Sequence, residues 1–403
     1  MMKFVLKQVK NGCRLGQLVD LPKEVAEKSL ETPMCMLYTR AGSVPYMGRD
    51  VLDRIDKLPG AVNMPIPLLV ENMDAMAEFP GGIKKFAAMD DFMTYCSIQD
   101  PAVLTPSGYN TKKAVSVWSC HGKYELDIPG YIKLMSSLDV DWVQSLSDGD
   151  TDRNTSEKRV IKSVERTINY LDELLEEKEK HEKLHSTKLI GTIVGGYLEE
   201  KRFHSARETA KRPVAGFSME GFHNFGPESE TFDLEDVKHL LSKTLELLPQ
   251  DKPRILPGLM SPANLLFAVE LGFDILDTSY PLFYRQMKIC SALCYDYNLP
   301  PTSTDNILRD SDEQSLGWEM DLYDERYRED TAPVVKSCTC YTCTHHTRAY
   351  INHLLKVSEL LAKLLLNVHN LHHYLRTFEV IRRAIADDTF KHLKQHIINQ
   401  KPS

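Results

Sequence analysis

Residues 338–343 read Cys-Thr-Cys-Tyr-Thr-Cys, and His369 follows 26 positions after the last of these cysteines. Thiolate sulfur and imidazole nitrogen suit tetrahedral zinc, and three cysteines with one histidine fill all four positions. Such a filled shell leaves no position for water or substrate. We therefore expect one structural Zn²⁺ ion, bound by Cys338, Cys340, Cys343 and His369.

The sequence after the cysteines indicates how a distant histidine could complete this set. Residues 347–378 carry leucine and valine at three- and four-residue steps, which is the pattern of a helix. One straight helix of 26 residues would carry His369 about 39 Å away from Cys343. Ser358, ahead of Glu359, is a preferred N-cap residue type. We therefore predict a break there, and an αα-hairpin that returns His369 to the cysteines.

Two alternatives stay open at this point. The cysteines could be free thiols or form a disulfide, although nine cysteines in 403 residues without a secretory leader favour a reducing compartment, where clustered cysteines usually bind metal. The fourth ligand could also be another nearby histidine. The candidates are His345, His346, His353, His372 and His373.

Composition and charge exclude several classes of protein. Hydrophobic residues make up 42% and charged residues 26%, as in ordinary globular proteins. Lysines interrupt the apolar positions of residues 1–12, so we expect no secretory leader, and no apolar run reaches the roughly 18 residues of a membrane span. A net charge of −8 is the wrong sign for binding nucleic acid over the whole surface.

A local basic face would still be compatible with this net charge. Each candidate also fits an ordinary solvated helix surface. The candidates are Lys201, Arg202, Arg207, Lys211, Arg212, Arg382 and Arg383.

The fold class follows from an alternation of strand-like and helix-like runs after about residue 125. Residues 189–194 form a continuous apolar run, typical of a strand buried on both faces of a parallel sheet. This alternation with short links favours a TIM (β/α)8 barrel over an open sheet. The predicted strands are 140–144, 189–194, 214–218, 254–259 and 274–277, and the predicted helices are 157–183, 199–211, 234–248 and 263–272.

The predicted domain organisation has three parts. Residues 1–300 form the main barrel, whose first 120 residues look β-rich and irregular. Residues 301–375 comprise an acidic loop and an inserted zinc-binding subdomain near the C-terminus. Residues 376–403 form a C-terminal helical segment that we expect to pack on the barrel.

Several segments resemble tRNA-guanine transglycosylases. The resemblance covers most of the chain from about residue 140 onward, in family order. It implies a TIM barrel with a zinc subdomain, in enzymes that exchange a guanine of the tRNA anticodon for a modified 7-deazaguanine base. The segments that carry it are 338–343, 345–355, 368–370, 204–217, 248–258 and 272–277.

The catalytic residues that this resemblance implies are only partly present. Asp277 stands at the position of the family's nucleophile, a carboxylate that attacks the ribose carbon, but residues 278–286 depart from the family's pattern. The family segment Asp-Ser-Gly-Gly-Phe-Gln, whose Asp transfers a proton, is replaced by residues 95–101, Tyr-Cys-Ser-Ile-Gln-Asp-Pro. A nucleophile without its partners should be slow by several orders of magnitude.

The residues implied for base recognition diverge as well. Val194 stands where a glutamine that reads the base edge is expected, and its side chain makes no hydrogen bond. Glu220-Gly221 replaces a Gly-Gly pair whose backbone approaches the base, so a bulky charge enters where a side chain should be missing. Asp148 fits the family's base-contacting acid, although its neighbours differ.

This combination resembles the accessory, non-catalytic subunits of the eukaryotic family members. It implies no catalytic residue in this chain and a heterodimer with a catalytic subunit that exchanges guanine for queuine at wobble position 34 of tRNAs with GUN anticodons. We expect this chain to supply a dimer interface, through its zinc module, and part of the tRNA-binding surface. A homodimer of the chain without its partner is left open. The resemblance also implies a cytoplasmic protein, peripheral at the mitochondrial outer membrane. The alternative is an active transglycosylase with Asp277 as nucleophile.

Overall fold

The computed structural model describes residues 2–22, 25, 30–227, 229, 232–258, 260–282, 290–299 and 317–400. The chain divides into two compact units. The first comprises Met1–Val44, Pro59–Met260 and Phe267–Ser279, and the second comprises Pro45–Leu58, Ser261–Leu266 and Tyr280–Ser403. The predicted domain boundaries near residues 300 and 375 stay predictions, and the first part of the acidic stretch, 300–316, lies outside the described residues.

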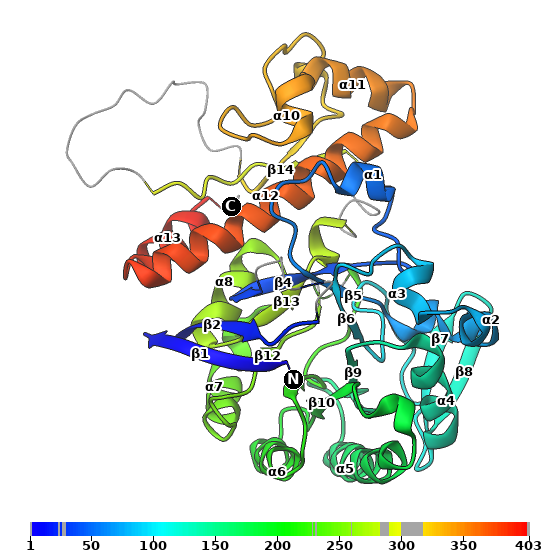
Figure 1. The fold of residues 1–403 in the computed structure, drawn as a ribbon. Coiled ribbons are helices and arrows are strands. Elements are labelled where there is room, and N and C mark those ends of the chain that lie inside the picture. The colour runs from blue at the N-terminus through cyan, green and yellow to red at the C-terminus, as the bar shows by residue number, and fades with distance from the viewer. Residues whose placement is uncertain are drawn as a thin grey trace. The chain divides into compact units, whose positions relative to one another are not determined.

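The first unit is built on a closed barrel of parallel strands (Figure 1). Each strand pairs in parallel with the next along the chain, and β13 closes the ring by pairing with β4. The predicted TIM barrel is therefore confirmed. The strands, in their order around the barrel, are β4 (Met34–Tyr38), β5 (Ala61–Asn63), β6 (Met93–Cys96), β9 (Trp142–Gln144), β10 (Lys188–Ile193), β11 (Gly216–Met219), β12 (Arg254–Ile255) and β13 (Ile275–Asp277).

Amphipathic helices cover the outside of this barrel (Figure 1). In α5 the buried positions Val160, Val164, Leu171 and Leu174 recur at helical spacing, so one stripe faces the strands while the charged side chains face solvent. The helices between successive strands are α4 (Ile128–Leu138), α5 (Glu157–Glu179), α6 (Glu199–Ala210) and α7 (Lys238–Glu246), and α8 (Pro262–Leu271) follows β12.

The first 120 residues contribute more to the barrel than their irregular pattern predicts. Three barrel strands, β4, β5 and β6, come from this region, and they are joined by short helices. The remaining elements of the first unit are β1 (Lys3–Lys10), β2 (Cys13–Val19), β3 (Glu31–Thr32), η1 (Ile66–Leu68), η2 (Val70–Asn72), α2 (Met73–Glu78), α3 (Gly82–Phe86), β7 (Ala114–Ser119), β8 (Gly122–Asp127), η3 (Glu182–Leu184) and η5 (Leu234–Val237).

The antiparallel sheet β1-β2-β3 closes the barrel at the N-terminal ends of its strands. Phe4 and Leu18 of this sheet belong to the same buried cluster as the barrel residues Tyr95 and Ile255. Arg14 of β2 donates to the Asp274 carboxylate, 3.0 Å away and next to the start of β13. The C-terminal ends of the strands, at the opposite end of the barrel, remain as the place for a site.

The second unit combines a small antiparallel sheet with helices. Strands β14 and β15 pair in antiparallel register, with Ala292 opposite Met320. The elements are α1 (Arg49–Leu52), β14 (Ser291–Leu293), β15 (Glu319–Asp321), η7 (Glu325–Tyr327), α10 (Tyr341–His345), α11 (Arg348–Lys356), α12 (Leu360–Ala386) and α13 (Phe390–Ile398).

The predicted break near Ser358 is present, but its mechanism differs from the prediction. Ser358 is not the N-cap of α12; Glu359 occupies that position without a side-chain hydrogen bond. Instead Ser358 adopts φ of 60°, and the backbone N–H of Glu359 donates to the Leu354 carbonyl while that of Ser358 donates to Leu355. This pair of bonds is a Schellman motif, which ends α11. The αα-hairpin therefore depends on the end of the first helix.

Two further expectations concern the surface. Among the described helices, none has the length and apolar character of a membrane span. The interpretation of Arg202 as part of a solvated basic face is wrong, because its side chain is fully buried and donates to the carbonyls of Gly196, Glu220 and Gly221. Arg212 also differs from a free surface charge, since it pairs with Asp172 at 2.5 Å.

Candidate metal centre and barrel mouth

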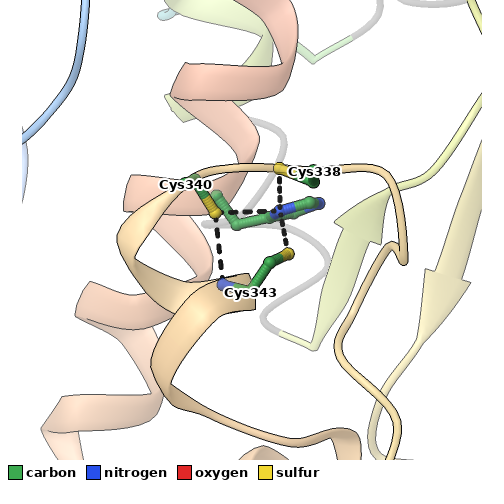
Figure 2. A group of neighbouring side chains, drawn as sticks. Cys338, Cys340 and Cys343 are labelled. Atoms are coloured by element: carbon green, nitrogen blue, oxygen red, sulfur yellow. Dashed lines mark hydrogen bonds between the residues drawn. The ribbon is translucent and has the colours of Figure 1, made fainter.

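Three cysteines and one histidine meet in the second unit. The ligand atoms of Cys338, Cys340, Cys343 and His369 lie within 4.8 Å of one another, and all four residues are buried. Figure 2 shows the three cysteine side chains converging from one loop and the start of a short helix. The structure thus brings together the four residues that the sequence predicts as one set.

The distances fit a tetrahedral metal shell. Nδ1 of His369 lies 3.7 Å from Sγ of Cys338, 3.5 Å from Sγ of Cys340 and 3.3 Å from Sγ of Cys343. A tetrahedral zinc ion at about 2.3 Å from sulfur and about 2.05 Å from nitrogen sets those atoms about 3.6 Å apart. The spacing and the donor chemistry therefore both fit zinc.

The histidine ring is held in the orientation that a metal ligand needs. Nε2 of His369 lies 2.8 Å from the Leu293 carbonyl of β14. A hydrogen bond donated there places the ring proton on Nε2, so the Nδ1 lone pair faces the sulfurs. Asn370 fixes the same strand, because its side chain accepts from the Leu293 N–H and donates to the Ser291 carbonyl.

The cysteine loop is ordered by its own short helix. Cys340 is the N-cap of α10, and its Sγ accepts from the backbone N–H of Cys343 at 3.3 Å. The thiolate charge at this helix end is favourable because backbone N–H groups point toward it. The hydroxyl of Thr342 donates to the Leu365 carbonyl of α12, which joins the loop to the helix that carries His369.

The five competing histidines are not part of the group. His345 and His346 stack on tyrosine rings, with His345 4.4 Å from the Tyr341 ring. His353 is exposed, and His373 lies 3.0 Å from the Tyr295 carbonyl through its Nε2. His372 is buried but is not within the four-residue group.

The cysteines are also part of the core around them. They share one buried cluster with residues of β14, β15, α11 and α12, including Met320, Ile351 and Leu365. Because all four ligands are buried in this cluster, a metal ion bound here would supply folding free energy. A second group, Glu71, Cys120 and His121, lies in the first unit and is exposed.

At the barrel mouth, the Asp277 carboxylate is fully engaged by the backbone. One oxygen accepts from the N–H of Ser279 at 2.7 Å and the other from the N–H of Gly258 at 3.0 Å. The side chain is buried, and burial raises the pKa of Asp277 to about 6 despite these hydrogen bonds. Of the divergent stretch after it, residues 283–286 lie outside the described part of the chain.

A second carboxylate near Asp277 was missed in the sequence. Asp100, within the segment that replaces the family's proton-transfer motif, is buried and accepts from the Tyr38 hydroxyl at 3.0 Å. Burial raises the pKa of Asp100, and its charge adds to the elevation of the Asp277 pKa. An acid one position before Pro101 in an otherwise altered motif was the signal that could have indicated it.

Asp148 is held by two arginines and cannot read a base. Arg159 donates to both carboxylate oxygens, at 2.6 and 2.9 Å, and Arg166 donates to one of them at 3.0 Å. Asn110 donates at 2.9 Å, and Asp148 has no exposed surface. The sequence reasoning missed these arginines, although their spacing of seven places them on one face of α5.

Glu220 fills the place where the resemblance implies a glycine. Its carboxylate accepts from Gln144 Nε2 at 2.6 Å and from the Ser147 hydroxyl at 3.0 Å. Gln144 in turn accepts from the N–H of Ile98 at 3.1 Å and the Tyr95 hydroxyl at 3.3 Å. Burial raises the pKa of Glu220, and the donors that a bound base would need are already used.

The backbone beside Glu220 is equally crowded. Gly221 has φ of +73°, and a Cβ there would lie 3.5 Å from that of Val194 and 2.9 Å from the Thr151 hydroxyl oxygen. A Cβ on Gly149 would lie 2.9 Å from Oε2 of Glu220. The buried Arg202 guanidinium holds the carbonyls of residues 220 and 221 from the other side.

The described residues next to Glu220 line a small cavity. A cavity lined by Gln99, Asn110, Ser147, Glu220 and His223 has a volume of about 50 Å³. Small-molecule sites usually measure about 300–1,000 Å³, so this cavity suits a few waters rather than a purine. The Glu220 network therefore takes up the position at which the resemblance implies close approach of a base.

Comparison with known proteins gives a consistent result over the full length. The family model for queuine tRNA-ribosyltransferase matches residues 10–403. The chain is 38% identical to a Xenopus tropicalis protein named queuine tRNA-ribosyltransferase accessory subunit 2, with 99% of this chain and 100% of the relative covered. Relatives with that name from Homo sapiens and Drosophila mojavensis are 37% and 32% identical, covering 99% of this chain and 100% and 92% of their own lengths.

Proposed function

Because this chain belongs to the queuine tRNA-ribosyltransferase family, we propose that it is an accessory, non-catalytic subunit that pairs with a catalytic homologue. The relatives at 32–38% identity are all named as accessory subunits. The observation that carries the non-catalytic role is the Glu220 network at the barrel mouth. Glu220 and Gln144 satisfy each other there, in the space where a base would have to bind.

The partner subunit performs the chemistry in this proposal. The complex exchanges guanine for queuine at wobble position 34 of tRNAs with GUN anticodons, and this chain contributes a dimer interface and part of the tRNA-binding surface. The net charge of −8 is compatible with that division, because only one local face would need to meet phosphate. In the absence of the partner the chain forms a homodimer. A cytoplasmic location, with peripheral association at the mitochondrial outer membrane, is proposed on the resemblance alone.

The proposed cofactor is one structural zinc ion. Cys338, Cys340, Cys343 and His369 would hold it, with the Leu293 carbonyl fixing the histidine ring. Four protein ligands leave no open position, so the bound ion would stabilise the second unit without activating water. The cysteine loop and α12 would thereby form a rigid surface suited to dimerisation.

Reconstitution with the catalytic subunit tests the proposal. Rates of labelled queuine incorporation into tRNA would be compared for complexes that contain wild-type chain, Asp277→Asn, or the exposed control Asp20→Asn, with complex formation checked by size-exclusion chromatography. We expect the three complexes to have equal rates and the catalytic subunit alone to be slower. A collapse of the rate in the Asp277→Asn complex, with the heterodimer intact, would overturn the non-catalytic role.

One observation favours the alternative of an active enzyme. Asp277 is retained at the end of β13, and the nearby Asp100 provides a second buried carboxylate. An active transglycosylase would use Asp277 as nucleophile and would need the Glu220 network to open. The same reconstitution distinguishes the two functions, because only an active chain would lose turnover with Asp277→Asn.

A further inference from the structure

A second, larger cavity lies at the opposite end of the barrel from the mouth. It measures about 580 Å³ and is partly open to solvent. Its walls come from the segments that lead into β9, β10, β11 and β12, from β1 and from the C-terminal end of α5. The N-terminal ends of parallel strands are far from the catalytic end in barrels of this class, so this cavity is separate from the mouth.

The cavity is lined by lysines that have no carboxylate partner. Lys178 of α5 is buried, and Lys188 and Lys252 are half-buried. None of the three forms an ion pair or side-chain hydrogen bond with another described residue; Lys252 lies 5.6 Å from the centre of the Phe217 ring. Burial lowers the pKa of Lys178, and the Lys188 charge lowers it further. Unpaired, partly desolvated cations are unfavourable unless an anion joins them.

The acidic residues of the same cavity do not offset this charge. Glu179 and Asp251 are exposed at its rim, whereas the lysines are more buried. Both carboxylates raise the pKa of a neighbouring lysine, Glu179 that of Lys178 and Asp251 that of Lys252, but burial is the larger effect in each case. With Lys3, four lysines line the cavity against these two carboxylates, so the formal charge of the lining is positive.

The lining of the cavity also includes apolar side chains. Phe4, Leu189 and Val214 line the cavity together with Trp142. The indole N–H of Trp142 is buried, and it has no hydrogen-bond acceptor among the described residues.

We propose that this cavity binds a small phosphate monoester with an aromatic or apolar body, of about mononucleotide size. The phosphate would sit among Lys178, Lys188 and Lys252, and the body would lie against Trp142 and Phe4. Three ammonium groups favour a dianion over a singly charged carboxylate, and the volume lies within the usual range for small-molecule sites. The binding does not depend on the proposed function, since the cavity shares no residue with the mouth.

Fluorescence titration of the full-length chain with AMP and with phenyl phosphate tests this site, with calorimetry as an independent readout. Lys178→Met removes the charge and keeps the side-chain stem, and Lys252→Met is a second variant of the same kind. Lys180→Met is the matched control, because Lys180 is exposed on the same chain segment and pairs with Glu177 at 2.6 Å. Trp142→Phe shows whether the fluorescence change comes from Trp142. Inorganic phosphate measures the contribution of the phosphate group alone. Benzoate measures binding of an aromatic body with a single negative charge.

We expect saturable binding of both organic phosphates, weakened at least about tenfold by Lys178→Met or Lys252→Met and unchanged by Lys180→Met. The fluorescence change should disappear in Trp142→Phe while calorimetry still detects binding. The proposal is overturned if neither organic phosphate binds below about 5 mM, well above typical small-ligand affinities. It is also overturned if inorganic phosphate or benzoate binds as tightly, or if the two lysine variants bind like the wild type.

Discussion

Replacing Asp277 with asparagine removes the buried carboxylate at the end of β13 while keeping its size. Burial raises the pKa of this group from its ordinary value of 3.8 to about 6. The folded state therefore holds the proton more tightly than the unfolded state, and the wild type loses stability as pH rises from about 4 to 6. At pH 7.5 the group is ionised in both the folded and the unfolded state. A pKa shift of this size then lowers the free energy of unfolding of the wild type by about 3 kcal/mol relative to its value at a pH where both states are protonated.

The asparagine variant has no such titration. Its free energy of unfolding relative to wild type should therefore increase by about 1.4 kcal/mol between pH 5 and pH 7.5. The variant should also lose a fixed amount of stability at every pH. One amide oxygen replaces the two carboxylate oxygens that accept from the backbone N–H groups of Gly258 and Ser279. The pH dependence, rather than the absolute difference, is the readout.

Urea unfolding at pH 5, 6, 7 and 7.5 measures this difference. Taking the difference from wild type cancels any loss of metal at low pH, because that loss affects both proteins. Asp20→Asn, an exposed aspartate in the left-handed region that asparagine also tolerates, is the control and should give no pH-dependent difference. A difference that is flat, or that shrinks as pH rises, would refute the reasoning.

Substitutions at the metal centre, at Glu220 and at Asp148 give three further tests. Cys340→Ser should abolish binding of one zinc ion per chain and destabilise the second unit by several kcal/mol, whereas substitution of the exposed Cys120 by serine should change neither. Zinc analysis and thermal unfolding measure the two effects. A full zinc content in Cys340→Ser would contradict the assignment. Glu220→Gln removes the carboxylate, keeps one oxygen as acceptor for Gln144 and lets the new amide N–H donate to the Ser147 hydroxyl. Its stability at pH 7.5 should therefore equal that of the wild type or exceed it by about 1 kcal/mol, whereas Glu220→Ala should lose about 2–4 kcal/mol in urea unfolding. Arg159→Met should cost about 2 kcal/mol and be partly rescued by Asp148→Asn in a double-mutant cycle; additive effects would argue against their ion pair.

The candidate metal centre could be predicted because its ligands lie within one short stretch of the sequence. The tight cysteine spacing defines three donors, and the helical rise alone requires a reversal before His369. What the sequence did not indicate was the device that makes the turn. Ser358 has a left-handed backbone conformation, which is unusual for residues other than glycine and asparagine. The preference of serine for N-cap positions therefore predicted the wrong role for this residue.

The barrel was predictable as a class but not in its first half. Strands β5 and β6 are three and four residues long and are joined by short helices, so hydrophobic periodicity has too few positions to register them. The partners of buried charges were also inaccessible. Gln144 meets Glu220 because the barrel brings β9 and the end of β11 together, although the two residues are far apart in the sequence.

Incorporation of labelled guanine into tRNA by the zinc-loaded chain, without any partner, tests the non-catalytic role most directly. We expect no incorporation above background, because Glu220 and Asp148 already have their hydrogen bonds satisfied within the protein. Incorporation that Asp277→Ala abolishes, and that Asp20→Asn leaves intact, would contradict the non-catalytic role.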